Sequence, residues 1–277
     1  MNLTLIVGAG HCGCTLLSRI LRDHPDVLSV RDLCAALITD PPDPPGAEID
    51  GETAWSRLTT ARPDLPPGEV AGTSPPSPRT GPGTLLDVLA PVIRRQPSGP
   101  PAAHYRALLE HLAARSGRTT IVDHCTAALH LVPALHAALP DAHVVHMHRD
   151  GPDCALSMSR HAESTQRAAA QPTSPYPLPV LGALWSSMIV DGVAALDVLP
   201  APLTSTLRYE DLLRSPETTL TRLAATLNTA VDGDWLARSR ARVTPDTIGR
   251  SRRLPPHELA ALEAACRPGM KALGRTA

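Results

Sequence analysis

The first 25 residues constrain the fold most strongly, because an apolar run, a glycine-bearing turn and an amphipathic segment follow one another without a gap. Residues 3–7, LTLIV, are continuously apolar, which is typical of a strand buried on both faces. After the turn GAGHCG, the segment TLLSRILRDHP places its leucines and isoleucine on one helical face and ends before Pro25. This succession predicts the strand–helix unit of a parallel sheet.

The same alternation continues along the chain. Residues 27–30, 119–124, 142–150 and 204–212 predict further strands, and the segments between them have the apolar spacing of helices. Strands that alternate with helices form mostly parallel sheets covered on both faces. We therefore predict an α/β fold in which residues 1–277 form one domain, with a P-loop-type central parallel sheet of about five strands flanked by helices.

Residues 41–103 differ in character from the rest of the chain. About half of the 30 prolines lie there, in clusters such as DPPDPP and TSPPSP. Two interpretations fit this composition: a substrate lid with short helices inside it, or a disordered insertion.

Charge and hydropathy exclude several classes of protein. The formal net charge of −1 argues against general nucleic-acid binding, which needs a basic face. The N-terminus lacks the basic region and apolar run of a signal peptide, and no segment approaches the roughly 18 apolar residues of a membrane span. We expect a cytoplasmic protein with no membrane partner, whose six cysteines are thiols. The oligomeric state is left open.

The turn between the first strand and the first helix is a candidate anion site. Its backbone N–H groups, from Gly10 to Thr15, lack helical partners and lie at the positive end of the helix dipole. The frame resembles a phosphate loop, but Cys14 stands where nucleotide triphosphatases have the lysine that contacts their β- and γ-phosphates. A triphosphatase is therefore a poor fit, and a glycine turn without a ligand is the plain alternative.

Four blocks in a fixed order resemble the sulfotransferases. Residues 7–29 are similar to the family's 5′-phosphosulfate loop, and residues 144–161, VVHMHRDGPDCALSMSRH, are similar to the strand and helix that hold the 3′-phosphate. Residues 207–228 resemble the R-Y-E-D-L segment, and residues 248–275 resemble the C-terminal segment. The nearest branch is the bacterial and Golgi type that includes the protein-tyrosine sulfotransferases.

The resemblance implies the donor 3′-phosphoadenosine 5′-phosphosulfate, which leaves as adenosine 3′,5′-bisphosphate. It also implies a hydroxyl or amine acceptor, which we expect to belong to a small molecule such as a natural product. Arginine suits the 3′-phosphate because its charge is permanent and its fork is bidentate. The residues that the resemblance assigns to the donor are Gly10, His11, Cys12, Gly13, Cys14, Thr15, Leu16, Arg149, Ser157 and Tyr209. Two interpretations remain open for Arg250, Arg252 and Arg253: they close over the phosphate from the C-terminal loop and bind the donor, or they form a solvated basic run.

The catalytic positions of the branch carry different residue types in this chain. Aligned without gaps, the family's loop arginine falls on His11, its glutamate base on Asp32 and its lysine on His124. Our hypothesis is that Asp32 is the base and that the donor's charge raises the pKa of both histidines, making them cations. Two alternatives remain: a metal site built from the same three residues, although we expect no resident metal, or a non-catalytic nucleotide-binding protein.

Overall fold

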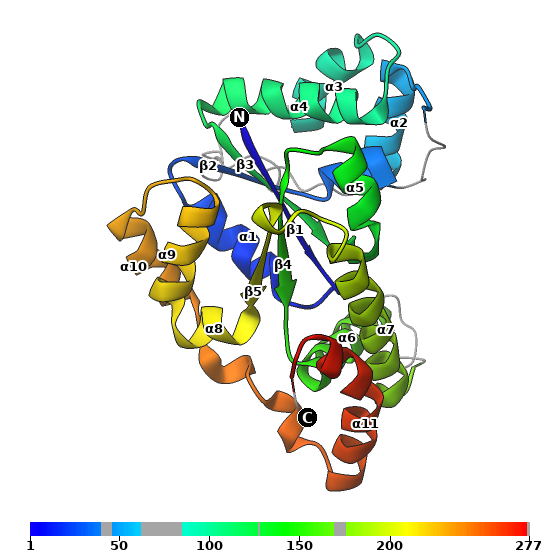
Figure 1. The fold of residues 1–277 in the computed structure, drawn as a ribbon, viewed down its shortest axis with the longest axis vertical. Helices are drawn as coiled ribbons and strands as arrows, with labels where there is room; N and C mark the ends of the chain where they lie inside the picture. Colours follow the sequence, from blue (N-terminus) through cyan, green and yellow to red (C-terminus); the bar gives the residue numbers. More distant parts are fainter. Residues whose placement is uncertain (40–45, 62–84, 127, 169–175, 276–277) are drawn as a thin grey trace.

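The computed structural model describes residues 1–39, 46–61, 85–126, 128–168 and 176–275. Within them, five strands form one all-parallel sheet in the order β2-β3-β1-β4-β5 (Figure 1). This arrangement confirms the predicted α/β class and the five-stranded parallel sheet. The strands are β1 (Asn2–Gly8), β2 (Val27–Arg31), β3 (Thr120–Thr126), β4 (His143–His148) and β5 (Thr204–Arg208).

Helices separate the strands, and local sequence sets several of their ends. α4 ends at Ser116 because Gly117 adopts the left-handed conformation, with φ of 67°. Proline occupies the first turn of several helices, where its missing N–H costs no hydrogen bond. The α-helices are α1 (Cys14–Arg22), α2 (Gly51–Ala61), α3 (Leu85–Arg94), α4 (Pro101–Ser116), α5 (Val132–Ala138), α6 (Gly151–Ala168), α7 (Leu178–Leu196), α8 (Tyr209–Arg214), α9 (Pro216–Thr226), α10 (Gly233–Arg242) and α11 (Pro256–Ala272). The shorter helices are the π-helix η1 (Ala35–Thr39) and the 3₁₀ turns η2 (Leu129–Leu131), η3 (Ala201–Leu203), η4 (Pro245–Thr247) and η5 (Arg250–Arg253).

The sheet separates two apolar cores. Side chains of β1 alternate between them: Leu5 and Val7 join one core, and Ile6 joins the other. Each core contains one fully buried tryptophan, Trp185 on α7 and Trp235 on α10. Because the chain has no phenylalanine, these two indoles and many leucines fill the interior. Strands buried on both faces explain the continuous apolar runs seen in the sequence.

The strand order places a topological switch at β1. The chain passes from β1 to β2 and β3 on one side, and then crosses to β4 and β5 on the other. Open α/β sheets bind ligands in the crevice at the carboxyl ends of strands beside such a switch. The phosphate loop follows β1, Asp32 follows β2, Arg149 follows β4 and Tyr209 follows β5. The fold therefore brings four separate predicted segments to the same edge of the sheet.

The proline-rich segment of residues 41–103 is described only in part. Its described residues include α2, α3 and the start of α4. Ile49 and Gly99 pair as an isolated antiparallel bridge, with N–H to O distances of 2.9 and 3.0 Å in the two directions. This bridge holds the flanks of the segment together. The proline clusters at 41–45 and 62–84 lie outside the described residues.

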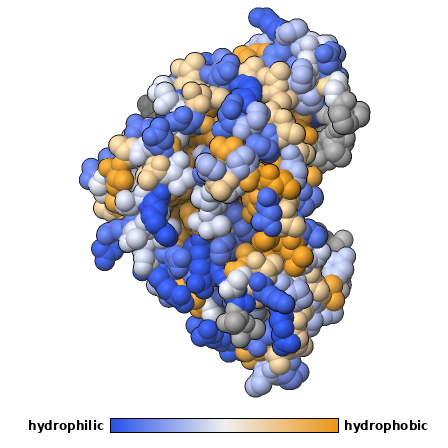
Figure 2. All heavy atoms as spheres, in the orientation of Figure 1, coloured by the Kyte–Doolittle hydropathy of each residue, from blue (hydrophilic) through white to orange (hydrophobic). Residues whose placement is uncertain are grey.

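One described helix, α7, is 19 residues long and apolar enough to cross a membrane by length and composition. The expectation that no segment approaches a span was wrong on that measure. In the fold, α7 packs against α6 and α11 and buries Trp185 and Ile189, whereas Val180, Leu184 and Val190 on the same helix are exposed and only 33% of its apolar stretch is buried. Figure 2 shows apolar side chains gathered near α5 and α7, and mostly hydrophilic ones over the α8–α10 side.

Candidate active site

The loop between β1 and α1 has a backbone that only certain residues can adopt. Gly10, His11 and Gly13 all have positive φ, at 66°, 50° and 107°. A Cβ on Gly13 would lie 2.3 Å from Cδ2 of Tyr209, so glycine is required there for space as well as for conformation. The Tyr209 ring therefore packs directly against the loop. This close packing fixes the backbone that leads into the N-terminus of α1.

The two loop cysteines point away from solvent. Cys12 and Cys14 are buried, their Sγ atoms lie 3.3 Å apart, and both belong to the core beneath α1. The hydrogen bond to Cys12 and burial together raise the pKa of Cys14, so its thiol is neutral at pH 7. Thr15 is exposed and Leu16 is half-buried. Of the predicted loop ligands, the cysteines can therefore reach an anion only through their backbone N–H groups.

A pocket of about 240 Å³ lies beside the loop, where α6, α8 and the C-terminal segment meet. Three arginines and one carboxylate face it, so the charge in the pocket is positive. The lining residues are Arg149, Asp153, Leu156, Ser157, Arg160, Tyr209, Thr247 and Arg250. Four of them, Arg149, Ser157, Tyr209 and Arg250, were predicted from the sequence.

Arg149 connects the pocket to the loop. It is only 7% exposed, and its guanidinium carbon lies 4.6 Å from the centroid of the Tyr209 ring, a cation–π contact. One terminal nitrogen donates to the carbonyl of Thr247 at 3.1 Å, and the other donates to the carbonyl of His11 at 3.4 Å. Ser157 approaches Nδ1 of His11 at 3.4 Å. The structure thus brings the two predicted phosphate signatures into contact.

The three C-terminal arginines separate in the structure. Arg250 lines the pocket, whereas Arg252 lines a second pocket of about 210 Å³ on the other side of Asp153. Arg253 is exposed and lines neither of these two pockets. Only the first of the three is therefore placed to contact a ligand beside Arg149.

Asp32 sits at the carboxyl end of β2 in a strained conformation, with φ of 53°. Its N–H donates to the carbonyl of His124 at 3.1 Å. The turn that follows is held by the buried Asp123, whose Oδ2 accepts from the N–H of Cys34 at 2.7 Å and from the hydroxyl of Tyr105 at 3.0 Å. Desolvation raises the pKa of Asp123 to about 6. The candidate base is thus carried by a tightly held turn.

His124 lies inside the protein, on the face of β3 that α1 covers. Its ring is fully buried, and Nε2 lies 3.1 Å from the hydroxyl of Ser29. Burial, with smaller contributions from the charges of Arg31 and Arg22, lowers the pKa of His124 to about 3. The ring is therefore neutral at pH 7 in this structure, and His124 does not line the Arg149 pocket. Nothing in this geometry supports the predicted cationic role.

Metal binding by the predicted catalytic residues also lacks a geometric basis. In the parts of the chain that the structure describes, no group of three or more His, Cys, Asp or Glu side chains is arranged to hold a metal ion. His11, Asp32 and His124 therefore do not form a ligand set, and the metal alternative is not supported.

Four pocket residues were not predicted from the sequence: Asp153, Leu156, Arg160 and Thr247. Three of them carried a usable signal, because positions 153, 156, 157 and 160 fall on one face of a helix that begins just after Arg149. Thr247 carried none. It lies 98 residues from Arg149 in the chain and reaches the pocket only through the tertiary fold.

Comparison with known proteins agrees with this geometry. The profile described as the sulfotransferase family matches residues 4–233. No curated protein matches the chain. Solved structures do: the sulfotransferase domain of the curacin biosynthetic pathway has a TM-score of 0.64 at 14% identity, covering 100% of this chain and 99% of that one. The sulfotransferase domain of the Synechococcus PCC 7002 olefin synthase has a TM-score of 0.58 at 16% identity, covering 100% and 96%.

A third structure, the sulfotransferase of Alicyclobacillus acidocaldarius, has a TM-score of 0.52 at 19% identity and covers 100% of this chain and 97% of that one. At these identities the structural likeness establishes the fold. The family profile, by contrast, spans most of the sequence and includes the loop, Asp32, Arg149 and Tyr209. The chain therefore belongs to the sulfotransferase family.

Proposed function

We propose that the protein transfers a sulfuryl group from 3′-phosphoadenosine 5′-phosphosulfate to a hydroxyl or amine of a small-molecule acceptor. The observation that carries the donor assignment is the state of Arg149. Its Nε is buried and has no hydrogen-bond partner among the described residues, although the guanidinium is permanently charged. A buried donor of this kind is costly unless a ligand satisfies it. A phosphate oxygen in the adjoining pocket would do so.

The residues around the pocket fit a ligand with a phosphate at each end. Arg149, Ser157 and Arg250 would bind the 3′-phosphate, because they line one pocket and supply two cations and a hydroxyl. The backbone N–H groups of residues 10–15 would bind the 5′ end, at the N-terminus of α1. Tyr209 contacts both parts, since it supports Arg149 by a cation–π contact and packs on the loop. The donor supplies an activated sulfuryl group attached to a phosphate leaving group.

The catalytic assignment rests on His11 and Asp32. Among the described residues, only three non-glycine residues have positive φ, and these are two of them. Such strain persists only where the surrounding structure enforces it, and it occurs often at active sites. Asp32 would accept the acceptor's proton, and His11, beside the Arg149 pocket, would stabilise negative charge as an imidazolium. His124 enters as a neutral, buried neighbour of Asp32, without the cationic role proposed from the sequence.

The acceptor class is the least constrained part of the proposal. Two of the similar structures are named for a biosynthetic pathway and an olefin synthase. Those names make alcohols and amines of natural-product type the first acceptors to test. Sulfation of the acceptor, measured by mass spectrometry with release of adenosine 3′,5′-bisphosphate, is the expected reaction.

Calorimetric titration with adenosine 3′,5′-bisphosphate tests the donor site directly. We expect micromolar or tighter binding, and binding at least 30-fold weaker, about 2 kcal/mol, for Arg149→Met, which keeps the side chain's bulk but removes its charge. Arg267→Met is the matched control, because Arg267 is exposed on α11, and its affinity should equal that of the wild type. Failure of the wild type to bind the bisphosphate, or equal binding by both variants, would refute the donor assignment.

A non-catalytic nucleotide-binding protein is the second candidate function, favoured by the replacement of both family cations by histidine. It predicts normal bisphosphate binding with no turnover of the sulfated donor on any acceptor. The proposed enzyme predicts turnover that falls at least 100-fold in Asp32→Asn while bisphosphate affinity is retained, since the loss of a general base typically costs about 10²–10⁴-fold. Turnover in the wild type therefore separates the two.

A further inference from the structure

The segment of residues 245–253, which we call the C-terminal strap, forms the wall between the two pockets. Thr247 and Arg250 face the Arg149 pocket, while Gly249, Ser251 and Arg252 face the second one. The strap consists of two short 3₁₀ turns joined at Gly249, which has φ of 70°. So short a segment has little hydrogen bonding of its own. Its position must therefore come from contacts with the rest of the protein.

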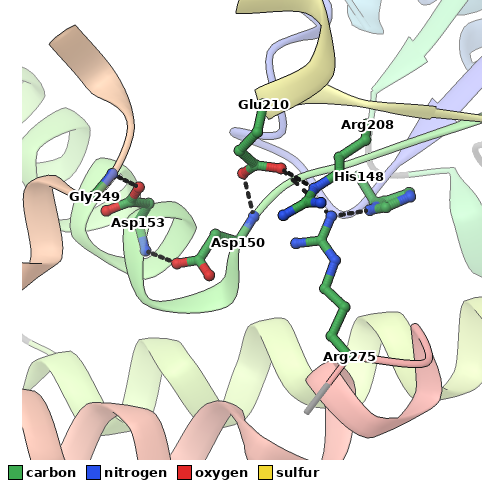
Figure 3. Close-up of polar contacts among 7 residues, drawn as sticks. All are labelled: His148, Asp150, Asp153, Arg208, Glu210, Gly249 and Arg275. Atoms are coloured by element: carbon green, nitrogen blue, oxygen red, sulfur yellow. Dashed lines mark hydrogen bonds and ion pairs between the residues drawn. The ribbon is translucent and has the colours of Figure 1, made fainter. Parts of the chain in front are cut away.

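One carboxylate supplies two of the hydrogen bonds that anchor the strap. Asp153 is 2% exposed, and its two oxygens accept separate backbone hydrogen bonds from the strap, at 2.6 Å from Gly249 N and 2.8 Å from Ser251 N. Figure 3 shows the Asp153 carboxylate at the start of α6, directed at the backbone of Gly249. Hydrogen bonds to a buried charge are about twice as strong as neutral ones. The strap is thus held at two points by one side chain.

Asp153 is itself held rigidly. Its N–H donates to Oδ1 of Asp150 at 3.2 Å, and the N–H of Asp150 donates to Oε1 of Glu210 at 2.8 Å. Glu210 also pairs with Arg208 at 2.9 Å and with Arg275 at 3.4 Å (Figure 3). This chain of contacts runs from the strap to the carboxyl ends of β4 and β5. The strap is therefore fixed to the same edge of the sheet that carries Arg149 and Tyr209.

On the side that faces the Arg149 pocket, the strap contacts two of the pocket's residues, Arg149 and Tyr209. The carbonyl of Thr247 accepts from Arg149 at 3.1 Å, and its hydroxyl lies 2.9 Å from that of Tyr209. Arg250, which lines the pocket, donates from Nε to the carbonyl of Asp246 within the strap at 3.0 Å. Displacement of the strap would remove Arg250 from the pocket and leave the Arg149 guanidinium with one hydrogen bond fewer.

We propose that Asp153 is a positioning residue which holds the C-terminal strap against the Arg149 pocket before any ligand binds. This proposal rests on the proposed function, since it assigns the strap to the nucleotide site. It gives a negatively charged residue a favourable role in binding a phosphate. Simple electrostatics predicts the opposite, because removing a carboxylate from the wall of the pocket should strengthen anion binding. The sign of the effect therefore distinguishes positioning from charge.

The test compares Asp153→Asn with Asp246→Asn, which removes one charge from an exposed position of the same strap. The N–H groups of Gly249 and Ser251 each donate to a separate oxygen of Asp153. Asparagine has only one oxygen that can accept, because its amide nitrogen is a donor. We expect affinity for adenosine 3′,5′-bisphosphate to fall roughly ten-fold in Asp153→Asn, the loss of about one charge-assisted hydrogen bond. Asp246→Asn should bind as the wild type does, or slightly more tightly. Unchanged or tighter binding by Asp153→Asn would overturn the proposal.

Hydrogen exchange of the ligand-free proteins tests the strap without reference to function. In the wild type, peptides covering residues 245–254 should be protected, and Asp153→Asn should lose this protection while β4 keeps its own. Fast exchange of the wild-type strap would overturn the proposal even if Asp153→Asn failed to fold. The two measurements also separate this proposal from the proposed function. If the wild type binds no bisphosphate, the proposed function fails. If its strap is nevertheless protected from exchange, and Asp153→Asn loses that protection, the anchoring by Asp153 stands.

Discussion

The neutral state of His124 predicts a specific sensitivity to acid. In the folded protein, burial lowers the pKa of His124 to about 3, whereas a solvated histidine in the unfolded chain titrates near pH 6.5. Below pH 6.5 the unfolded chain therefore takes up a proton that the folded protein does not. The folded-state pKa is depressed, so the contribution of His124 to stability is fully present above pH 6.5 and is lost as the pH falls.

The size of the effect follows from the same two values. Each pH unit between about 6.5 and 3 costs about 1.4 kcal/mol, so at pH 5 the contribution of His124 is about 2 kcal/mol smaller than at pH 7.5. Burial also lowers the pKa of His146 to about 3 and of His148 to about 4, and both add to the loss. The raised pKa of Asp123, about 6, opposes it below pH 6. We expect a net loss of several kcal/mol between pH 7.5 and pH 5.

Urea unfolding at pH 7.5 and pH 5 measures this difference, and His124→Gln isolates one residue. Glutamine does not titrate, so the variant should lose about 2 kcal/mol less than the wild type between the two pH values, whatever its stability at pH 7.5. His257→Gln, at an exposed position on α11, is the control and should lose as much as the wild type. Equal losses for His124→Gln and the wild type would refute the reasoning that the ring is buried and neutral.

Three further predictions concern the loop, the core and the thiols. Gly13→Ala should cost about 2–3 kcal/mol of unfolding free energy and abolish bisphosphate binding, since its Cβ would overlap the Tyr209 ring; unchanged binding by calorimetry would contradict the described loop. Trp235→Phe removes the 2.8 Å hydrogen bond from Nε1 to the carbonyl of Ile20 and should destabilise the protein by about 1–3 kcal/mol in urea; no loss would mean that the indole is not packed as described. All six cysteines are buried, so a thiol reagent should react with them only slowly in the native protein and with all six in urea; rapid labelling of the native protein would show that the loop opens readily.

Local sequence was sufficient to predict most of the backbone. Apolar runs, glycines and prolines mark the strands and the helix ends, because these signals act over a few residues and depend little on distant contacts. The expectation about membrane spans failed at α7 for the same reason. Length and composition show that the helix is long and apolar, but only the fold shows that α6 and α11 pack against it and bury 33% of its apolar stretch.

Some features of the candidate site were likewise predictable from local sequence, and others depended on the tertiary structure. The sequence by itself determined that a glycine loop would follow the first strand and that Arg149 would follow the fourth, because strand, turn and helix are encoded by adjacent residues. Tertiary structure alone decided that the ring of His124 would be enclosed beneath α1, and that Arg250 rather than Arg253 would face the pocket. It also decided that Asp153 would reach Ser251, 98 residues away. The physical reason is that a side chain's charge state and partners depend on what packs around it, and those neighbours come from segments far apart in the chain.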